Sequence, residues 1–121
     1  MSESKMSIGW IGAGRMGIQL ATRLIEAGYD VAVYNRTKSK LQPLLDIGAT
    51  AVDRPVDLSG RDLVFSMVSA SADLKQVMLG EGGLLTGSET PQIVADSSTV
   101  SPEASAEIRA AAEAKGTAFL A

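Results

Sequence analysis

Residues 12–17 read Gly-Ala-Gly-Arg-Met-Gly, a run with glycine at the first, third and sixth positions. A short apolar run, Ser7 to Ile11, precedes it and suits a buried parallel strand. In a strand–turn–helix unit, Gly12 would permit the tight turn, Gly14 would let the backbone approach a pyrophosphate, and Gly17 would let the helix pack closely. The free N–H groups at the start of that helix attract anions. The spacing therefore predicts a dinucleotide-binding turn.

A second group of candidate binding residues, Asn35, Arg36 and Thr37, follows an apolar strand-like run at residues 31–34. In Rossmann units a carboxylate at this place accepts hydrogen bonds from the adenosine ribose hydroxyls of NAD. Here the position is neutral and a guanidinium follows it. Arg36 can pair with a 2′-phosphate, which a carboxylate would repel. Thr37 either adds a hydroxyl to that phosphate or caps the next helix. The sequence thus predicts NADP(H) as the cofactor.

Each of these interpretations has a plainer alternative. A glycine turn can exist without a ligand, and a surface arginine such as Arg36 is commonly only solvated. Arg15, at the start of the expected helix, either reaches the phosphates or is solvated in the same way. The strand–turn–helix–strand context within about 30 residues favours binding for the turn. The position directly after the second strand favours binding for Arg36.

The surrounding pattern alternates strand-like and helical runs, which predicts an α/β fold. Six strands are expected at Ser7–Ile11, Val31–Tyr34, Ala49–Val52, Leu63–Val68, Ile93–Asp96 and Thr117–Leu120. Helices or helical turns are expected at Arg15–Ala27, Leu41–Ile47, Arg54–Ser59, Ala72–Leu79 and Pro102–Lys115, the last capped by Ser101. The expected architecture is a Rossmann-type, doubly wound parallel sheet in the order 3-2-1-4-5-6, with helices on both faces. One dinucleotide-binding domain would span residues 1–121.

Ligands of such sheets bind beyond the carboxyl ends of the strands, near the point where the strand order reverses. Val68 ends the fourth expected strand, and Ser98 and Thr99 follow the fifth. We expect these three residues to border the nicotinamide and its ribose. Core packing is the alternative for Val68, and turn or cap formation is the alternative for the two hydroxyl residues.

The composition excludes several kinds of chemistry. The chain has 121 residues without cysteine or histidine, so it has no disulfide, thiolate site or histidine base, and no metal site is expected. The formal net charge of −3 argues against a nucleic-acid surface. No apolar run approaches the ~18–20 residues of a membrane span, and the first residues lack the apolar core of a signal peptide. A cytoplasmic location is expected.

Five segments together resemble the β-hydroxyacid dehydrogenase family, which includes 3-hydroxyisobutyrate and 6-phosphogluconate dehydrogenases. They are Gly9–Gly17, Ala27–Tyr29, Val33–Thr37, Asp96–Pro102 and Gly116–Leu120, in the family's order. The similarity spans nearly the whole chain and is more specific than the glycines alone. It implies the NADP-binding domain of an oxidoreductase that transfers hydride between NADP and a hydroxy acid or its oxo acid.

The resemblance also implies roles for individual positions. Met16 would lie against the cofactor, and Ser98 or Thr99 near its nicotinamide end. The family's substrate segment is expected just beyond Ala121, and its catalytic lysine and asparagine further on, in a helical domain that mediates dimerisation. We therefore expect no catalytic residue in these 121 residues, and cofactor binding without turnover. A small hydroxy acid substrate and a homo-oligomer are expected for the full-length enzyme.

Three other functions stay open from the sequence. The N-terminal domains of imine reductases share the glycine turn and the Asn-Arg-Thr end, although Asp96–Pro102 leans towards the hydroxyacid group. A non-catalytic cofactor-binding module would also lack catalytic residues. A methyltransferase using S-adenosylmethionine is disfavoured by Arg36, because the ribose of that cofactor usually meets an acidic residue.

Overall fold

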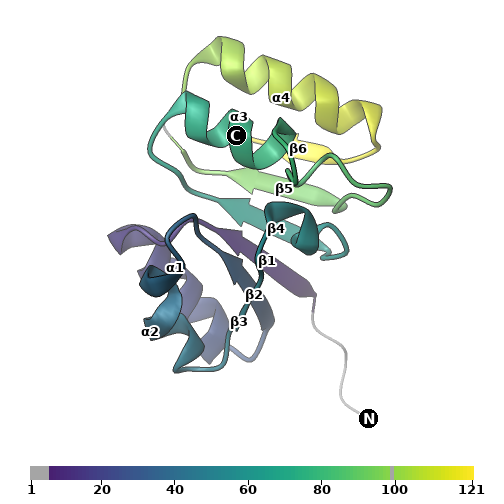
Figure 1. Ribbon diagram of the computed structural model, residues 1–121. Helices are drawn as coiled ribbons and strands as arrows, with labels where there is room; N and C mark the ends of the chain where they lie inside the picture. The colour runs from purple at the N-terminus through teal and green to yellow at the C-terminus, as the bar shows by residue number, and fades with distance from the viewer. Residues whose placement is uncertain (1–5, 99) are drawn as a thin grey trace.

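The computed structural model describes residues 6–98 and 100–121, which form a six-stranded parallel sheet (Figure 1). The strands are β1 (Ser7–Ile11), β2 (Asp30–Tyr34), β3 (Thr50–Ala51), β4 (Leu63–Ser66), β5 (Ile93–Asp96) and β6 (Ala118–Leu120). Their order is β3-β2-β1-β4-β5-β6, and each neighbouring pair is parallel. The predicted fold class and strand order are confirmed. The order reverses between β1 and β4.

Helices cover both faces of the sheet (Figure 1). Within the described ranges they are α1 (Arg15–Glu26), α2 (Gln42–Leu45), α3 (Ser71–Leu79), α4 (Pro102–Ala114) and the 3₁₀ helices η1 (Lys38–Leu41) and η2 (Pro55–Leu58). Because side chains alternate along a strand, each face has its own apolar core. Val31 and Val33 of β2 pack in the cluster of α1 and α2, whereas Ala32 belongs to the cluster of α3 and α4. None of these described helices is long and apolar enough to span a membrane.

The predicted element boundaries agree with the structure to within about two residues, and the differences have local causes. The expected helix at residues 41–47 begins as α2 at Gln42, with Pro43 in its first turn, where the missing N–H of proline removes no helical hydrogen bond. β4 ends before the predicted Val68, because the Val68 N–H donates to the Ser98 side chain instead of to a strand. Ser101 caps α4 as predicted, its Oγ accepting from a first-turn N–H at 3.1 Å.

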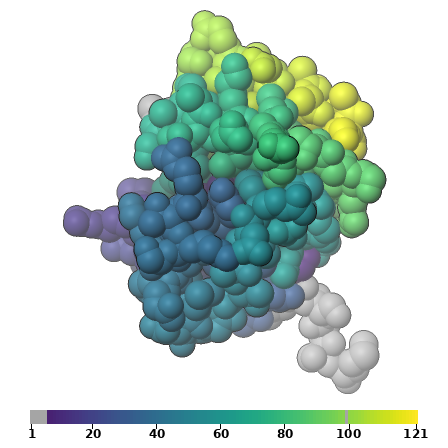
Figure 2. Space-filling view, in the orientation of Figure 1, coloured from purple at the N-terminus to yellow at the C-terminus, as the bar shows by residue number. Residues whose placement is uncertain are grey.

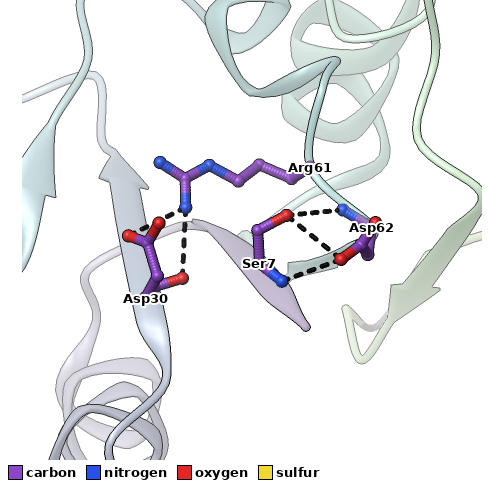
Figure 3. Close-up of polar contacts among 4 residues, drawn as sticks. All are labelled: Ser7, Asp30, Arg61 and Asp62. Atoms are coloured by element: carbon purple, nitrogen blue, oxygen red, sulfur yellow. Dashed lines mark hydrogen bonds and ion pairs between the residues drawn. The ribbon is translucent and has the colours of Figure 1, made fainter. Parts of the chain in front are cut away.

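A polar cluster joins the strands at the amino-terminal edge of the sheet (Figure 3). The Asp62 carboxylate accepts from the Ser7 N–H at 2.9 Å, and the Asp62 N–H donates to Ser7 Oγ at 3.1 Å. Arg61 donates to the backbone carbonyl of Asp30 and pairs with its carboxylate at 3.0 Å. These contacts join the start of β4 to the starts of β1 and β2. They brace the edge opposite the one where ligand binding is predicted.

Candidate cofactor-binding site

The loops after β1, β2 and β4 and one side of α3 enclose a cavity of about 230 Å³. It lies at the carboxyl edge of the sheet, where the strand order reverses and where parallel α/β sheets bind ligands. Its lining residues are Ile11, Gly12, Ala13, Gly14, Tyr34, Asn35, Arg36, Thr37, Lys40, Met67, Val68, Ser69, Asp73, Gln76 and Val77. Six of the predicted binding residues therefore gather at one cavity: Gly12, Gly14, Asn35, Arg36, Thr37 and Val68.

The turn after β1 is so tight that one of its glycines has no room for a side chain and a second has little. Gly12 has a φ of 110°, and a Cβ there would lie 2.0 Å from the backbone oxygen of Met67. A Cβ on Gly17 would lie 3.1 Å from the Gly12 carbonyl oxygen and 3.3 Å from Trp10 Nε1. The buried indole of Trp10 donates from Nε1 to that same carbonyl at 2.8 Å. Both glycines thus serve the shape of the turn itself.

Gly14 differs, because nothing within the described part of the protein requires a glycine there. Its φ of −71° and ψ of 173° suit any residue, and a Cβ would have no heavy atom within 4 Å. The residue lines the cavity and directly precedes α1, whose first turn has no side-chain cap from the described residues. A bare backbone facing open space beside helix N–H groups fits a phosphate-bearing ligand. The residues present therefore fit the pyrophosphate of a dinucleotide.

Asn35 ties the glycine turn to the loop after β2. Its Oδ1 accepts from the Ala13 N–H at 3.0 Å, and its Nδ2 donates to the Thr37 carbonyl at 2.9 Å. The Gly12 N–H donates to the Tyr34 carbonyl at 3.0 Å and adds a second link between the same segments. The neutral amide thus has a structural use, since a carboxylate could accept from Ala13 but could not donate to Thr37.

The loop after β2 presents two cations and a hydroxyl to the cavity. The Arg36 side chain is 84% exposed and pairs with Asp73 of α3 at 3.4 Å. Thr37 precedes η1 without capping it through its side chain, so the cap alternative for Thr37 is wrong. Lys40 lies in η1 and lines the same cavity. This grouping can pair with a phosphate more readily than with a neutral ribose hydroxyl.

The ends of β4 and β5 are held together by a serine–aspartate network. Ser98 Oγ accepts from the Val68 N–H at 2.8 Å and donates to Asp96 Oδ1 at 2.7 Å. Ser66 Oγ, which is buried, donates to the same carboxylate oxygen at 2.7 Å. The Ser98 hydroxyl thus fixes the position of Val68 at the cavity wall, and Ser98 itself does not line the cavity.

Besides Ser98, four predicted binding residues lie outside the cavity lining or outside the described residues. Arg15 and Met16 are exposed on the first turn of α1, Met16 with 62% of its surface accessible. Gly17 is buried beneath the turn, and Thr99 lies outside the residues that the structure describes. Cofactor contacts by Arg15, Met16 and Thr99 stay predictions.

Outside the predicted glycine turn and the predicted strand ends, sequence reasoning missed four lining residues: Lys40, Asp73, Gln76 and Val77. The last three are spaced i, i+3 and i+4, so they form one stripe along α3. A helix that begins directly beyond a strand end must turn one side towards the ligand edge of the sheet. That rule could have indicated the stripe from the sequence, whereas the exposed Lys40 carries no comparable signal.

Three features define a Rossmann-type dinucleotide-binding domain: the parallel sheet whose strand order reverses between β1 and β4, the glycine turn at that point, and the cavity beside it. Residues 7–121 match the family model described as the NAD binding domain of 6-phosphogluconate dehydrogenase. The chain belongs to this family. The family resemblance seen in the sequence motifs is confirmed, and so is a nicotinamide dinucleotide as the class of cofactor.

Named relatives of this domain are oxidoreductases. The chain is 39% identical over 117 residues to "Probable 3-hydroxyisobutyrate dehydrogenase-like 1, mitochondrial" from Arabidopsis thaliana, covering 95% of this chain and 35% of the relative. It is 36% identical over 114 residues to "NAD-dependent L-serine dehydrogenase" from Pseudomonas aeruginosa, covering 93% and 38%. An imine reductase from Myxococcus stipitatus in complex with NADP+ superposes with a TM-score of 0.80 at 26% identity, covering 93% and 39%. The chain thus spans well under half the length of these relatives.

Proposed function

We propose that this chain is the NADP(H)-binding domain of a β-hydroxyacid dehydrogenase-like oxidoreductase. The observation that carries the proposal is the exposed Arg36 at the cavity, directly after Asn35, which stands where an NAD-binding domain usually has a carboxylate. Lys40 adds a second positive charge, and Thr37 adds a hydroxyl that caps no helix. A related imine reductase is described with NADP+, although a related serine dehydrogenase is described as NAD-dependent.

Each part of the cavity has a place in this proposal. The glycine turn and the first turn of α1 would hold the pyrophosphate, and the loop after β2 would hold the 2′-phosphate. Val68 and Ser69 would border the nicotinamide end, with Ser98 fixing the wall behind them. The bound cofactor would supply or accept hydride. The chain's own residues would orient it and hold its phosphates.

The full-length reaction proposed is reversible hydride transfer between NADP and a small hydroxy acid or its oxo acid. The resemblance places the acid–base lysine outside these 121 residues, so we infer that the isolated chain binds cofactor without turnover. A homo-oligomer and a cytoplasmic location stay predictions for the full-length enzyme. An imine reductase-like enzyme is the second candidate, because a structure of that class shares this fold at 26% identity.

The test is isothermal titration calorimetry of the chain with NADP+ and with NAD+. We expect NADP+ to bind several-fold more tightly, and equal affinities would overturn the cofactor assignment. Arg36→Asp should lower NADP+ affinity by roughly tenfold to a hundredfold and leave NAD+ affinity largely unchanged, since a charged hydrogen bond contributes about 1.5–3 kcal/mol. Arg23→Asp makes the same charge change at an exposed position of α1 that does not line the cavity. That control should retain the wild-type preference.

A further inference from the structure

A carboxylate stands beside the arginine that would bind the 2′-phosphate. Arg36 Nη1 and Asp73 Oδ1 are 3.4 Å apart, one from the loop after β2 and the other from the first turn of α3. Both residues line the cavity. In the space-filling view the blue segment after β2 reaches the teal segment of α3 across this face (Figure 2). Two segments far apart in sequence therefore meet through an opposite-charge pair at the cavity.

Asp73 is acidic in a place where an anion site would favour positive charge. It is the acidic side chain among the described residues that line the cavity, and its side chain is 32% exposed. Its place in the first turn of α3 also offsets the positive end of that helix dipole. The carboxylate thus lowers the positive potential of both Arg36 and the α3 N-terminus towards a phosphate.

We propose that Asp73 sets the cofactor selectivity of this domain by competing with the 2′-phosphate of NADP(H) for Arg36. The inference rests on the proposed function, because it concerns the same cavity. An exposed ion pair contributes little to stability, so an incoming dianion can displace Asp73 from Arg36. The carboxylate nevertheless stays within about one Debye length, ~8 Å at physiological salt, of a phosphate paired with Arg36. Its repulsion opposes NADP(H) and leaves NAD(H), which lacks that phosphate, unaffected.

The decisive variant is Asp73→Asn, which keeps the side-chain size and removes the charge. Calorimetry at about 0.1 M salt should show NADP+ bound roughly threefold to tenfold more tightly than by wild type, with NAD+ affinity unchanged. The gain should shrink at about 1 M salt, where the Debye length is ~3 Å. Glu107→Gln is the matched control, because Glu107 of α4 pairs at 3.1 Å with Lys75 of α3, the helix that carries Asp73, and does not line the cavity. It should leave both affinities unchanged.

The outcomes separate this inference from the proposal beneath it. Weaker NADP+ binding by Asp73→Asn would mean that Asp73 only orients Arg36, which overturns the inference. An unchanged affinity, or an equal gain for both cofactors, overturns it as well. In each of those cases the proposed function would still stand if the wild type prefers NADP+ and Arg36→Asp abolishes that preference. A wild type that binds neither cofactor would refute the proposed function and this inference together.

Discussion

Gly14→Ala should weaken cofactor binding while leaving the stability of the fold nearly unchanged. Because nothing lies within 4 Å of a Cβ at Gly14 and its φ is −71°, the methyl group meets no steric obstacle in the protein. Replacing glycine by alanine at a compatible conformation stabilises by about 0.4–1 kcal/mol through the unfolded chain. Alanine is also a poorer helix N-cap than glycine, by an amount of similar size. The two effects nearly cancel, so we expect a change in Tm of no more than a few degrees.

Cofactor binding by the same variant should respond very differently. The methyl group would occupy the space through which the pyrophosphate approaches the backbone at the start of α1. Losing charge-assisted contacts worth about 1.5–3 kcal/mol would weaken NADP+ and NAD+ alike by roughly tenfold to a hundredfold. Calorimetry gives both affinities, and thermal unfolding without cofactor gives the stability. Wild-type affinity in Gly14→Ala would refute the assignment of this turn to the pyrophosphate.

Gly12→Ala is the comparison that shows what a structural glycine does. The positive φ of 110° strains an alanine by about 1–3 kcal/mol. The 2.0 Å approach of its Cβ to Met67 forces a further shift of the backbone. A loss of at least ~3 kcal/mol is a large part of a typical domain stability of about 5–15 kcal/mol. Thermal unfolding should show this loss without any ligand, whereas a variant as stable as Gly14→Ala would refute the steric reading of the turn.

Two smaller predictions concern the polar contacts of Ser98 and of Lys38. Ser98→Ala removes the hydroxyl that accepts a hydrogen bond from the Val68 N–H at 2.8 Å. The unpaired N–H should lower the free energy of unfolding by about 1–2 kcal/mol, which thermal unfolding would show as a lower Tm. An unchanged Tm would contradict this role of Ser98. Lys38 donates a hydrogen bond to Asp53, and this bond and the Lys38 charge lower the pKa of that exposed carboxyl below its ordinary value. The Lys38–Asp53 contact therefore stabilises the fold above the ordinary pKa of an aspartate, and this stabilisation is lost as the pH falls through the lowered pKa of Asp53. Lys38→Gln should raise the pKa of Asp53, as measured by NMR titration of its carboxyl group.

The sequence was sufficient for the fold because its signals were local and agreed with one another. Glycine spacing, apolar runs and the Ser101 cap each indicated an element, and the strand order followed from the connection rules of parallel sheets. The premature end of β4 could not be predicted, since it depends on the hydroxyl of Ser98, which is 30 residues away from Val68 in the chain. Local patterns carry no information on such a contact.

The site was predictable in part for the same reason. The glycine turn and Arg36 have fixed places in a strand–turn–helix–strand unit, so their gathering at one cavity followed from sequence. The partner of Arg36 did not, because Asp73 comes from the other half of the sheet and meets it only after folding. Reading Asn35 as a missing carboxylate was also incomplete, since its amide bridges two loops.

That bridge couples the geometry of the cavity to its proposed cofactor choice. An aspartate at position 35 would suit the ribose hydroxyls of NAD, but it would lose the donor that holds the Thr37 carbonyl at 2.9 Å. Arg36 stands between these two residues, so the hydrogen bond that fixes the loop also fixes the backbone from which the guanidinium projects. The amide would therefore serve the proposed NADP site twice: it leaves out a repelling charge, and it holds the loop that presents Arg36. In the proposed role, Asp73 would adjust the cofactor preference from across the cavity without disturbing the loop, because its contact is with the side chain of Arg36.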